Sequence, residues 1–275
     1  MKQHVLPVTV LNQKSQIQPE NGRPRRISQL WWGLSGVGVT ILLWQLAISL
    51  HLLGPQFGPA FSPANAVQAL AELAGSGVLW PHLQDSLRRV LVGLILAASL
   101  GIPIGLIIGY YRLAEAASGI VFQFLRMTSP LAWMPITIII FGVGDRPIYF
   151  LIAIAAVWPF IINTAHGVSK VNPIWIKVAR NLGASESQVL RKVVIPAIIP
   201  DILTGLRLAI GLAWVMLVPD EMLGVSSGLG YFILDTRDRF RYDQLMAAVL
   251  MVGLIGYLLD TLVRTVQRHY SWTVD

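Results

Sequence analysis

Three runs in this chain are long enough to cross a lipid bilayer without presenting a charged side chain to it. Residues 31–50 and 90–111 contain no Asp, Glu, Lys or Arg. Residues 147–169 are equally free of them, with His166 near their end. A transmembrane helix needs about 20 consecutive, mostly apolar residues. These runs therefore predict three transmembrane helices.

Three less regular apolar runs bring the predicted number of spans to six. Residues 118–143 are apolar but contain Arg126, and residues 208–219 and 244–259 are short enough to need flanking residues. Charged residues make up only 13% of the chain, whereas soluble proteins contain about 25%. The sequence thus predicts an all-α integral membrane protein with about six transmembrane helices. Its membrane domain is predicted at residues 30–270, between tails at 1–29 and 271–275.

The basic residues favour one orientation of these spans. With the amino terminus in the cytoplasm, the cytoplasmic segments carry more than twice as many Lys and Arg as the opposite segments. Because short cytoplasmic loops carry the excess of positive charge, both termini are predicted to be cytoplasmic. Topology in this way explains the formal net charge of +7 without nucleic-acid binding. The chain has no cysteine, which excludes disulfides and Cys-based metal sites.

Small residues and prolines mark two features inside the predicted spans. Gly101, Gly105 and Gly109 recur every four residues, so they share one helix face and would let a second helix approach closely. Prolines inside the third and fourth spans free backbone groups that neighbours or water must satisfy. These prolines are compatible either with a lined cavity or with kinks that are merely tolerated.

The longest predicted cytoplasmic loop, at about 170–200, carries a polar helix-turn-helix pattern. From residue 179 it reads ARNLGASESQVLRKVVIPAIIP. Asn172 and Pro173 suit the start of a first helix, and Gly183 suits the left-handed position after its end. Ser185 and Gln188 have the spacing of a capping box that starts a second helix. An interrupted apolar face is expected along the pair: Val178, Leu182, Val189, Leu190 and Val193. Such a short, capped pair of helices predicts a docking element.

This loop resembles the loop motif of ABC-importer permeases, which is written EAA, three residues, G, nine residues and I-x-LP. Ala179 matches the last alanine, Gly183 the glycine and Pro196 the proline. The chain departs from the motif with Lys177 and Val178 at the Glu and Ala positions, which puts a salt bridge of that Glu to the ATPase in doubt. In that family the loop is a coupling helix that binds the ATP-hydrolysing subunit. The resemblance therefore implies a coupling role for eight residues: Ala179, Arg180, Asn181, Leu182, Gly183, Ala184, Ser185 and Pro196.

The resemblance extends over most of the chain. The segments SLRRVLVGLILAASLGIPIGLIIGYYR and LAWVMLVPDEMLGVSSGLGYFI are similar to those of the nitrate, sulfonate, bicarbonate and taurine permease group. DEMLGVSSGLGYFILDTRDR is most similar to nitrate permeases. The resemblance implies a type I ABC importer fold with a cytoplasmic coupling helix. It further implies nitrate (and nitrite) as cargo, with bicarbonate or alkanesulfonate and taurine as alternatives on the same architecture.

The same resemblance implies a division of labour between subunits in a bacterial cytoplasmic membrane. Two permease subunits, expected to be identical, would form the pore, while two ATPase subunits would bind ATP and Mg²⁺. A binding protein would deliver the anion from outside. The chain itself lacks the G-x-x-x-x-G-K-[ST] phosphate loop, so it cannot build that ATP site and is not expected to be an enzyme.

Candidate substrate-pathway residues lie along the central and later spans. Arg126 could stabilise an anion in a pore of low dielectric constant, although a lipid-facing or paired arginine is an equally good interpretation. The other candidates combine large apolar groups with few polar ones, which is also typical of helix packing. The full set is Arg126, Met127, Ser129, Trp133, Met134, Trp158, Asn163, Trp214, Glu221 and Met222.

Two further patterns are assigned to the outer end of the fifth span. Gly224 to Gly228 matches G-x-S-x-G, but this motif needs a strand-to-helix turn and a His partner, so a flexible loop is favoured over a hydrolase. Asp220 and Glu221 are interpreted as solvated loop charges in preference to buried functional acids. An ion-gradient carrier would be expected to show inverted repeats and intramembrane acids, and is the less favoured class. No HExxH or other metal-binding spacing is present.

Overall fold

The computed structural model describes residues 26–50, 58 and 60–271, and in this part of the chain all regular secondary structure is helical. The predicted tails at 1–29 and 271–275 therefore lie almost entirely outside the described residues. The helices have the following bounds: α1 Arg26–Ser49, α2 Pro63–Gly75, α3 Leu79–Tyr110, α4 Arg112–Met127, η1 Pro130–Trp133, α5 Met134–Phe141, α6 Asp145–Lys170, α7 Pro173–Asn181, α8 Glu186–Val189, η2 Leu190–Val194, α9 Ile195–Gly224, α10 Leu229–Asp238 and α11 Tyr242–Ser271.

Four helical stretches in the described chain are long and apolar enough to cross a membrane: Leu79–Tyr110, Asp145–Lys170, Glu186–Gly224 and Tyr242–Gln267. They contain four of the six predicted spans to within one residue. The first predicted span coincides with α1, whose apolar part, Ser35–Ser49, is shorter than a full span. For that segment, membrane crossing stays a prediction.

The third predicted span, 118–143, is not a continuous helix. It divides into Leu113–Met127 and Pro130–Phe141, which are bent by 83° relative to each other. Ser129 has an extended backbone and precedes Pro130, and a residue before proline is disfavoured in the helical region by contact with the proline ring. The prediction of one span with internal prolines did not anticipate a break of this size, and Arg126 lies in the last turn of α4 next to the break.

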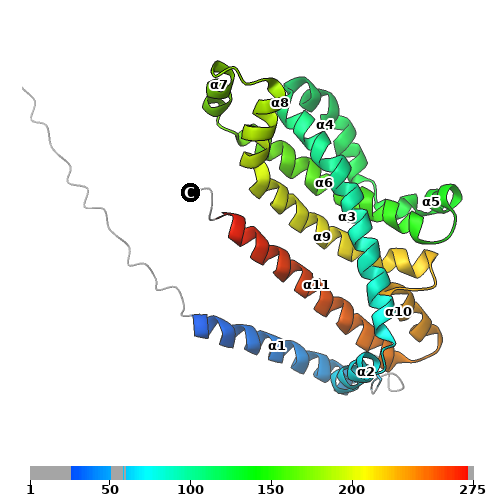
Figure 1. Ribbon diagram of the computed structural model, residues 1–275. Coiled ribbons are helices and arrows are strands. Elements are labelled where there is room, and N and C mark those ends of the chain that lie inside the picture. The colour runs from blue at the N-terminus through cyan, green and yellow to red at the C-terminus, as the bar shows by residue number, and fades with distance from the viewer. Residues whose placement is uncertain (1–25, 51–57, 59, 272–275) are drawn as a thin grey trace, which may run out of the picture.

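The core of the protein is a layer of three long helices, α3, α6 and α9, with α11 packed against α9 (Figure 1). The glycine face predicted on α3 faces α6. A Cβ atom built on Gly105 would lie 2.7 Å from the carbonyl oxygen of Ile161, and one on Gly109 would lie 2.6 Å from that of Ala165. Gly205 of α9 approaches the carbonyl oxygen of Pro159 on the opposite side of α6. These contacts confirm that the spacing marks a helix-packing face.

At one end of this layer, α7 and α8 form a small unit beside the ends of α3 and α4 (Figure 1). We call this the loop end, and the end that carries α2 and α10 the far end. A second apolar cluster holds the unit to the spans and consists of Val168, Val171, Val189, Val194 and Ile198. Of the predicted apolar face, Val189 is fully buried, whereas Leu182 is 83% exposed and Val178 is 51% exposed. For these two exposed residues, a docking role stays a prediction.

Candidate translocation groove and coupling loop

A groove with a cavity of about 940 Å³ lies between α6, α9, Asp260 of α11 and the bend that follows α4. Most of its wall is apolar, with Trp158, Leu212 and Met216 among the larger side chains. Charged groups enter it from three places, at Arg126, Arg207 and Asp260. The arrangement is a largely apolar surface with a few charges, which is the kind of lining that can hold a small ion.

Arg126 reaches this groove from the carboxyl-terminal turn of α4. A positive side chain is favoured there because the unpaired carbonyl groups make the helix end negative. The residue also lines a smaller cavity of about 250 Å³ with Phe122 and Trp158, whose rings meet edge to face at 5.5 Å. Across the described part of the chain, no acid or hydrogen-bond acceptor pairs with the Arg126 side chain. Its guanidinium is thus free to meet an anion.

The second arginine of the groove is paired with an acid that it shares with a third arginine. Arg207 Nε donates to Asp260 Oδ1 at 2.9 Å, and Arg264 donates to the other carboxylate oxygen at 2.6 Å. Arg207 lies on α9, whereas Asp260 and Arg264 lie one helical turn apart on α11. The sequence analysis missed this cluster, although the i,i+4 spacing of Asp260 and Arg264 was a visible signal for their pairing.

At the far end, Glu221 and Arg89 form a buried ion pair. Arg89 donates to Glu221 Oε1 at 2.6 Å and, through the same nitrogen, to the Ser227 carbonyl oxygen at 2.7 Å. Their side chains are 2% and 0% exposed. Glu221 also accepts from Ser86 and from the Gly230 N–H. The interpretation of Glu221 as a solvated loop charge was wrong, because α9 continues past Pro219 and carries this acid into the protein.

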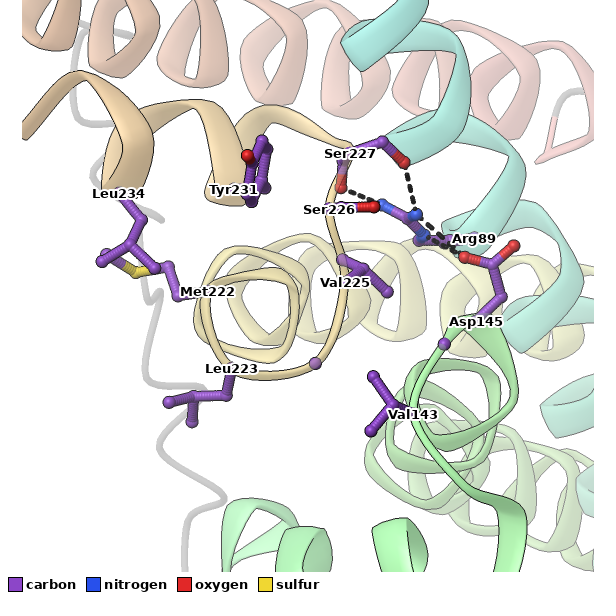
Figure 2. Close-up of a pocket in the computed structure, with 12 residues that line it drawn as sticks. Arg89, Val143, Asp145, Met222, Leu223, Val225, Ser226, Ser227, Tyr231 and Leu234 are labelled. Atoms are coloured by element: carbon purple, nitrogen blue, oxygen red, sulfur yellow. Dashed lines mark hydrogen bonds and ion pairs between the residues drawn. The ribbon is translucent and has the colours of Figure 1, made fainter. Parts of the chain in front are cut away.

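This buried pair connects several segments around a cavity of about 650 Å³. Figure 2 shows Arg89 pointing towards Ser227 and Asp145, with Tyr231 on the other side of the 225–228 loop. Arg89 Nε donates to Asp145 Oδ1 at 2.9 Å. The network therefore connects α3, the start of α6, the end of α9 and the loop before α10. Both carboxylate oxygens of Glu221 have hydrogen-bond partners, so the network serves to hold these segments together.

Asp220, the neighbour of Glu221, is equally buried but has no such partners. It is 0% exposed, and neither of its carboxylate oxygens has a hydrogen-bond partner among the described residues. A buried carboxylate without a partner is strongly disfavoured. The solvated-loop interpretation was wrong for this residue too.

The loop end has the local geometry that the sequence predicted. Asn172 caps α7 by accepting from Ile174 N at 2.9 Å, and Gly183 has φ +80. Ser185 and Gln188 form both hydrogen bonds of a capping box. A hollow of about 360 Å³ lies over the turn and is lined by four of the predicted coupling residues, namely Ala179, Leu182, Gly183 and Ala184, together with Gln188, Lys192 and Val193. Pro196 is the second residue of α9 and is exposed.

A three-residue contact, which the sequence analysis did not find, joins this loop to the end of α3. Arg180 donates to Glu186 Oε1 at 2.8 Å and to the Tyr110 hydroxyl at 2.9 Å. The Tyr110 hydroxyl in turn donates to Glu186 Oε2 at 2.5 Å. The hydrogen bond to Glu186 raises the pKa of the Arg180 guanidinium above its usual value. The loop is thus attached to α3 by a contact that stays charged, as well as to α9 through the chain.

Residues 101–272 match the family described as the binding-protein-dependent transport system inner membrane component. The match covers more than half of the chain and includes both the groove and the loop at about 170–200, which is the predicted coupling loop. The chain belongs to this family. It is therefore a permease subunit of an ABC importer, a class that works with ATPase and substrate-binding partners. No catalytic function is indicated for such a subunit.

Relatives of this permease include proteins for several anions. It is 42% identical over 194 residues to the bicarbonate transport system permease protein CmpB of Synechococcus elongatus, covering 70% of this chain and 69% of that protein. It is 42% identical to the nitrate import permease protein NrtB of Leptolyngbya laminosa, covering 68% and 67%. The taurine transport system permease protein TauC of Escherichia coli is 31% identical, covering 88% and 90%. The permease group expected from the sequence is confirmed.

A solved structure confirms the fold of the permease. The inward-facing MetNI methionine ABC transporter matches with a TM-score of 0.57 at 16% sequence identity, over 70% of this chain and 94% of that chain. This likeness bears on the fold alone, which is that of a type I importer. The family match excludes the ion-gradient carrier, although two acids are buried at the far end.

Only some of the predicted pathway residues line the groove of the permease. Arg126, Trp158 and Asn163 line it, and the Asn163 amide donates to the Pro159 carbonyl oxygen at 2.8 Å. Trp214 instead faces α11 and donates to the Val252 carbonyl oxygen. Met222 lines the far-end cavity with Arg89. The remaining candidates lie around the bend or, for Glu221, in the buried network with Arg89: Met127, Ser129, Trp133, Met134 and Glu221.

The G-x-S-x-G segment of the permease is a loop between α9 and α10, as the sequence predicted. The Ser227 hydroxyl accepts from Arg89 at 2.9 Å, and the Gly228 N–H donates to His82 Nδ1 at 3.1 Å. In the described chain, no histidine is hydrogen-bonded to Ser226 or Ser227. The segment lacks the nucleophile-base contact that a hydrolase needs.

Proposed function

We propose that this permease provides half of the path by which a small inorganic oxoanion, nitrate (and nitrite) in the first place, enters a bacterial cell across the cytoplasmic membrane. A second, identical permease subunit provides the other half. Both termini face the cytoplasm, so the loop end faces the ATPases. Support for this proposal comes from the family, from the relatives for nitrate and bicarbonate at equal identity, and from the charges in the groove.

The free guanidinium of Arg126 in the groove is the observation that carries the proposal. A charge in a low-dielectric passage is costly unless a group of opposite sign compensates for it. Arg126 offers this compensation, and its planar fork matches the oxygens of a planar oxoanion. The largely apolar wall penalises ions that hold their water tightly, which favours nitrate over bicarbonate. Bicarbonate or an alkanesulfonate such as taurine is the alternative cargo.

ATP-driven motion enters through the coupling loop. ATP and Mg²⁺ bind to the partner ATPases and not to this chain, which has no phosphate-binding loop. Closure of the ATPases moves the loop around Gly183, and the spans then rock as rigid bodies between two access states. The hollow over Ala179, Leu182, Gly183 and Ala184 supports this role, because it is an open and rigidly capped surface for a partner.

Substitution of Arg126 tests the cargo site. We expect Arg126→Ala to lower ATP-dependent nitrate uptake at least about tenfold, since one free charge in a partly dry passage is worth more than about 1.4 kcal/mol. Arg126→Lys keeps the charge without the planar fork and should retain part of the rate. Uptake is measured in proteoliposomes with the co-purified ATPases, ATP inside and the binding protein outside, for nitrate, nitrite, bicarbonate and taurine.

Arg237→Ala is the matched control, because Arg237 is an exposed arginine paired with Asp238 away from the groove. It should leave uptake unchanged. Uptake of nitrate at the wild-type rate by Arg126→Ala would remove Arg126 from the pathway. ATP-dependent uptake of bicarbonate or taurine in place of nitrate would keep the transporter and correct its cargo.

A further inference from the structure

We infer that Asp260 leaves only one of the two described arginines that line the groove without an acidic partner and thereby makes the permease selective for singly charged anions. This inference rests on the proposed function, because it concerns the charge of the same groove. Asp260 does not need to touch the anion. It acts by occupying Arg207, which would otherwise be a second anion-binding group.

The first step concerns the positions of the two arginines, which line the same cavity. A Cβ atom on Gly205 would lie 3.0 Å from the carbonyl oxygen of Pro159, so this turn of α9 faces the middle of α6. Arg207 is two residues further along α9, and Trp158 is next to Pro159 on α6. Arg126 shares both of its cavities with Trp158. An anion held beside Trp158 is therefore within the field of both guanidinium groups.

The second step concerns the charge that each arginine presents to the groove. Arg126 has no partner in the described chain, whereas Asp260 binds Arg207 at 2.9 Å on one oxygen and Arg264 at 2.6 Å on the other. Asp260 and Arg207 both line the cavity, but Arg264 does not. Of the two arginines that line the cavity, one therefore has no acidic partner and the other is paired with a carboxylate that Arg264 shares from outside the lining. Without the Asp260 carboxylate, neither arginine of the lining would have an acidic partner.

The third step concerns the consequence for transport. An ion must bind well enough to enter a passage and weakly enough to leave it. One arginine per subunit balances a singly charged oxoanion. Two unmasked arginines would hold a doubly charged anion such as sulfate, because the attraction grows with the product of the charges. The geometry thus assigns to Asp260 the exclusion of divalent anions and the easy release of monovalent ones.

Asp260→Asn tests this assignment, because it keeps the size of the side chain and removes its charge. Nitrate uptake is measured in proteoliposomes that enclose increasing concentrations of sulfate, at constant ionic strength. We expect the sulfate concentration that halves uptake to fall at least about tenfold in the variant. In a second measurement, sulfate should raise the melting temperature of the purified Asp260→Asn complex and leave that of the wild type unchanged.

Three further variants make the test specific. Asp243→Asn is the same change on the same helix, but Asp243 lies outside the groove beside Arg241, so its response to sulfate should be that of the wild type. Arg207→Gln should also resemble the wild type, since Asp260 keeps Arg264. The double variant Arg207→Gln with Asp260→Asn removes the unmasked arginine together with the carboxylate and should restore the wild-type sulfate response.

Each outcome bears on one claim. Equal sulfate sensitivity and equal melting shifts in Asp260→Asn, Asp243→Asn and the wild type would overturn the role of Asp260. A sulfate response that persists in the double variant would also overturn it, because Arg207 would not be the second binding group. Wild-type complex that takes up no anion with ATP would refute the proposed function instead, and the melting measurement would still decide whether Asp260 masks Arg207.

Discussion

At the scale of single residues, two adjacent acids have opposite surroundings. Glu221 accepts hydrogen bonds from Arg89, Ser86 and the Gly230 N–H, whereas neither carboxylate oxygen of Asp220 has a partner in the described chain. The sequence could not predict this difference. Pro219 suggested the end of a helix, but a proline inside a membrane helix removes only one backbone hydrogen bond and is tolerated. The partner of Glu221 lies 132 positions away, at Arg89.

These surroundings predict opposite effects of removing each charge. We expect Glu221→Gln to lower the free energy of unfolding by about 3 kcal/mol, because Arg89 is left buried with part of its charge uncompensated. Asp220→Asn should cost nothing or be slightly stabilising, since it removes a buried charge that has no partner. Thermal unfolding of the detergent-purified complex measures both. Equal destabilisation by the two variants would mean that Asp220 has a partner in the assembled complex.

At the scale of helices, the sequence predicted what depends on regular spacing and missed what depends on a local break. The four-residue spacing of Gly101, Gly105 and Gly109 was sufficient to predict that another helix packs closely on this face, because the period of the helix places them together, but it did not identify α6 as that helix. The prolines of residues 118–143 indicated a kink or a lined cavity, but the hydropathy continues through Ser129 and Pro130 and gave no sign that the bend reaches 83°. Arg126 was predicted to lie along the pathway, but the sequence could not show that this bend brings it to the edge of the groove.

The close contact of α3 with α6 predicts that even a methyl group is too large at its centre. Gly105→Ala places a Cβ atom 2.7 Å from both the carbonyl oxygen of Ile161 and the Cβ atom of Thr164. We expect a loss of about 1–3 kcal/mol of stability, as for other overpacked cores. Gly119→Ala is the control, because a Cβ atom there meets nothing within 4 Å. In α4 this change should be neutral or stabilising, as alanine is the better helix former. Melting temperatures of the two variants compare them directly, and equal values would show that the helices can separate at no cost.

At the scale of the whole molecule, the coupling loop and the groove are connected in two ways. The loop continues into α9, which carries Arg207 into the groove, and the contact of Arg180 with Tyr110 and Glu186 attaches it to α3. Because α3, α6 and α9 pack closely, a displacement of the loop would move the layer as one body. The sequence predicted the loop with its caps because these signals are local. It could not predict the attachment to α3, since Tyr110 is 70 positions from Arg180.

This connection predicts that strain in the loop turn uncouples ATP hydrolysis from transport, whereas equal strain elsewhere does not. Gly183 has φ +80 and Gly77 has φ +82, and a Cβ atom meets nothing within 4 Å at either position. Valine at either site therefore costs about the same 1–3 kcal/mol of backbone strain. Gly183→Val should raise the number of ATP molecules hydrolysed per anion several-fold, because the strain moves the turn between α7 and α8 off the ATPase surface. Gly77→Val strains the turn between α2 and α3 at the far end and should leave this ratio unchanged.

Asn tolerates positive φ better than other residues, so Gly183→Asn should restore most of the coupling. ATPase activity and anion uptake measured in the same proteoliposomes give the ratio, and identical ratios for the two valine variants would show that this turn does not transmit the motion.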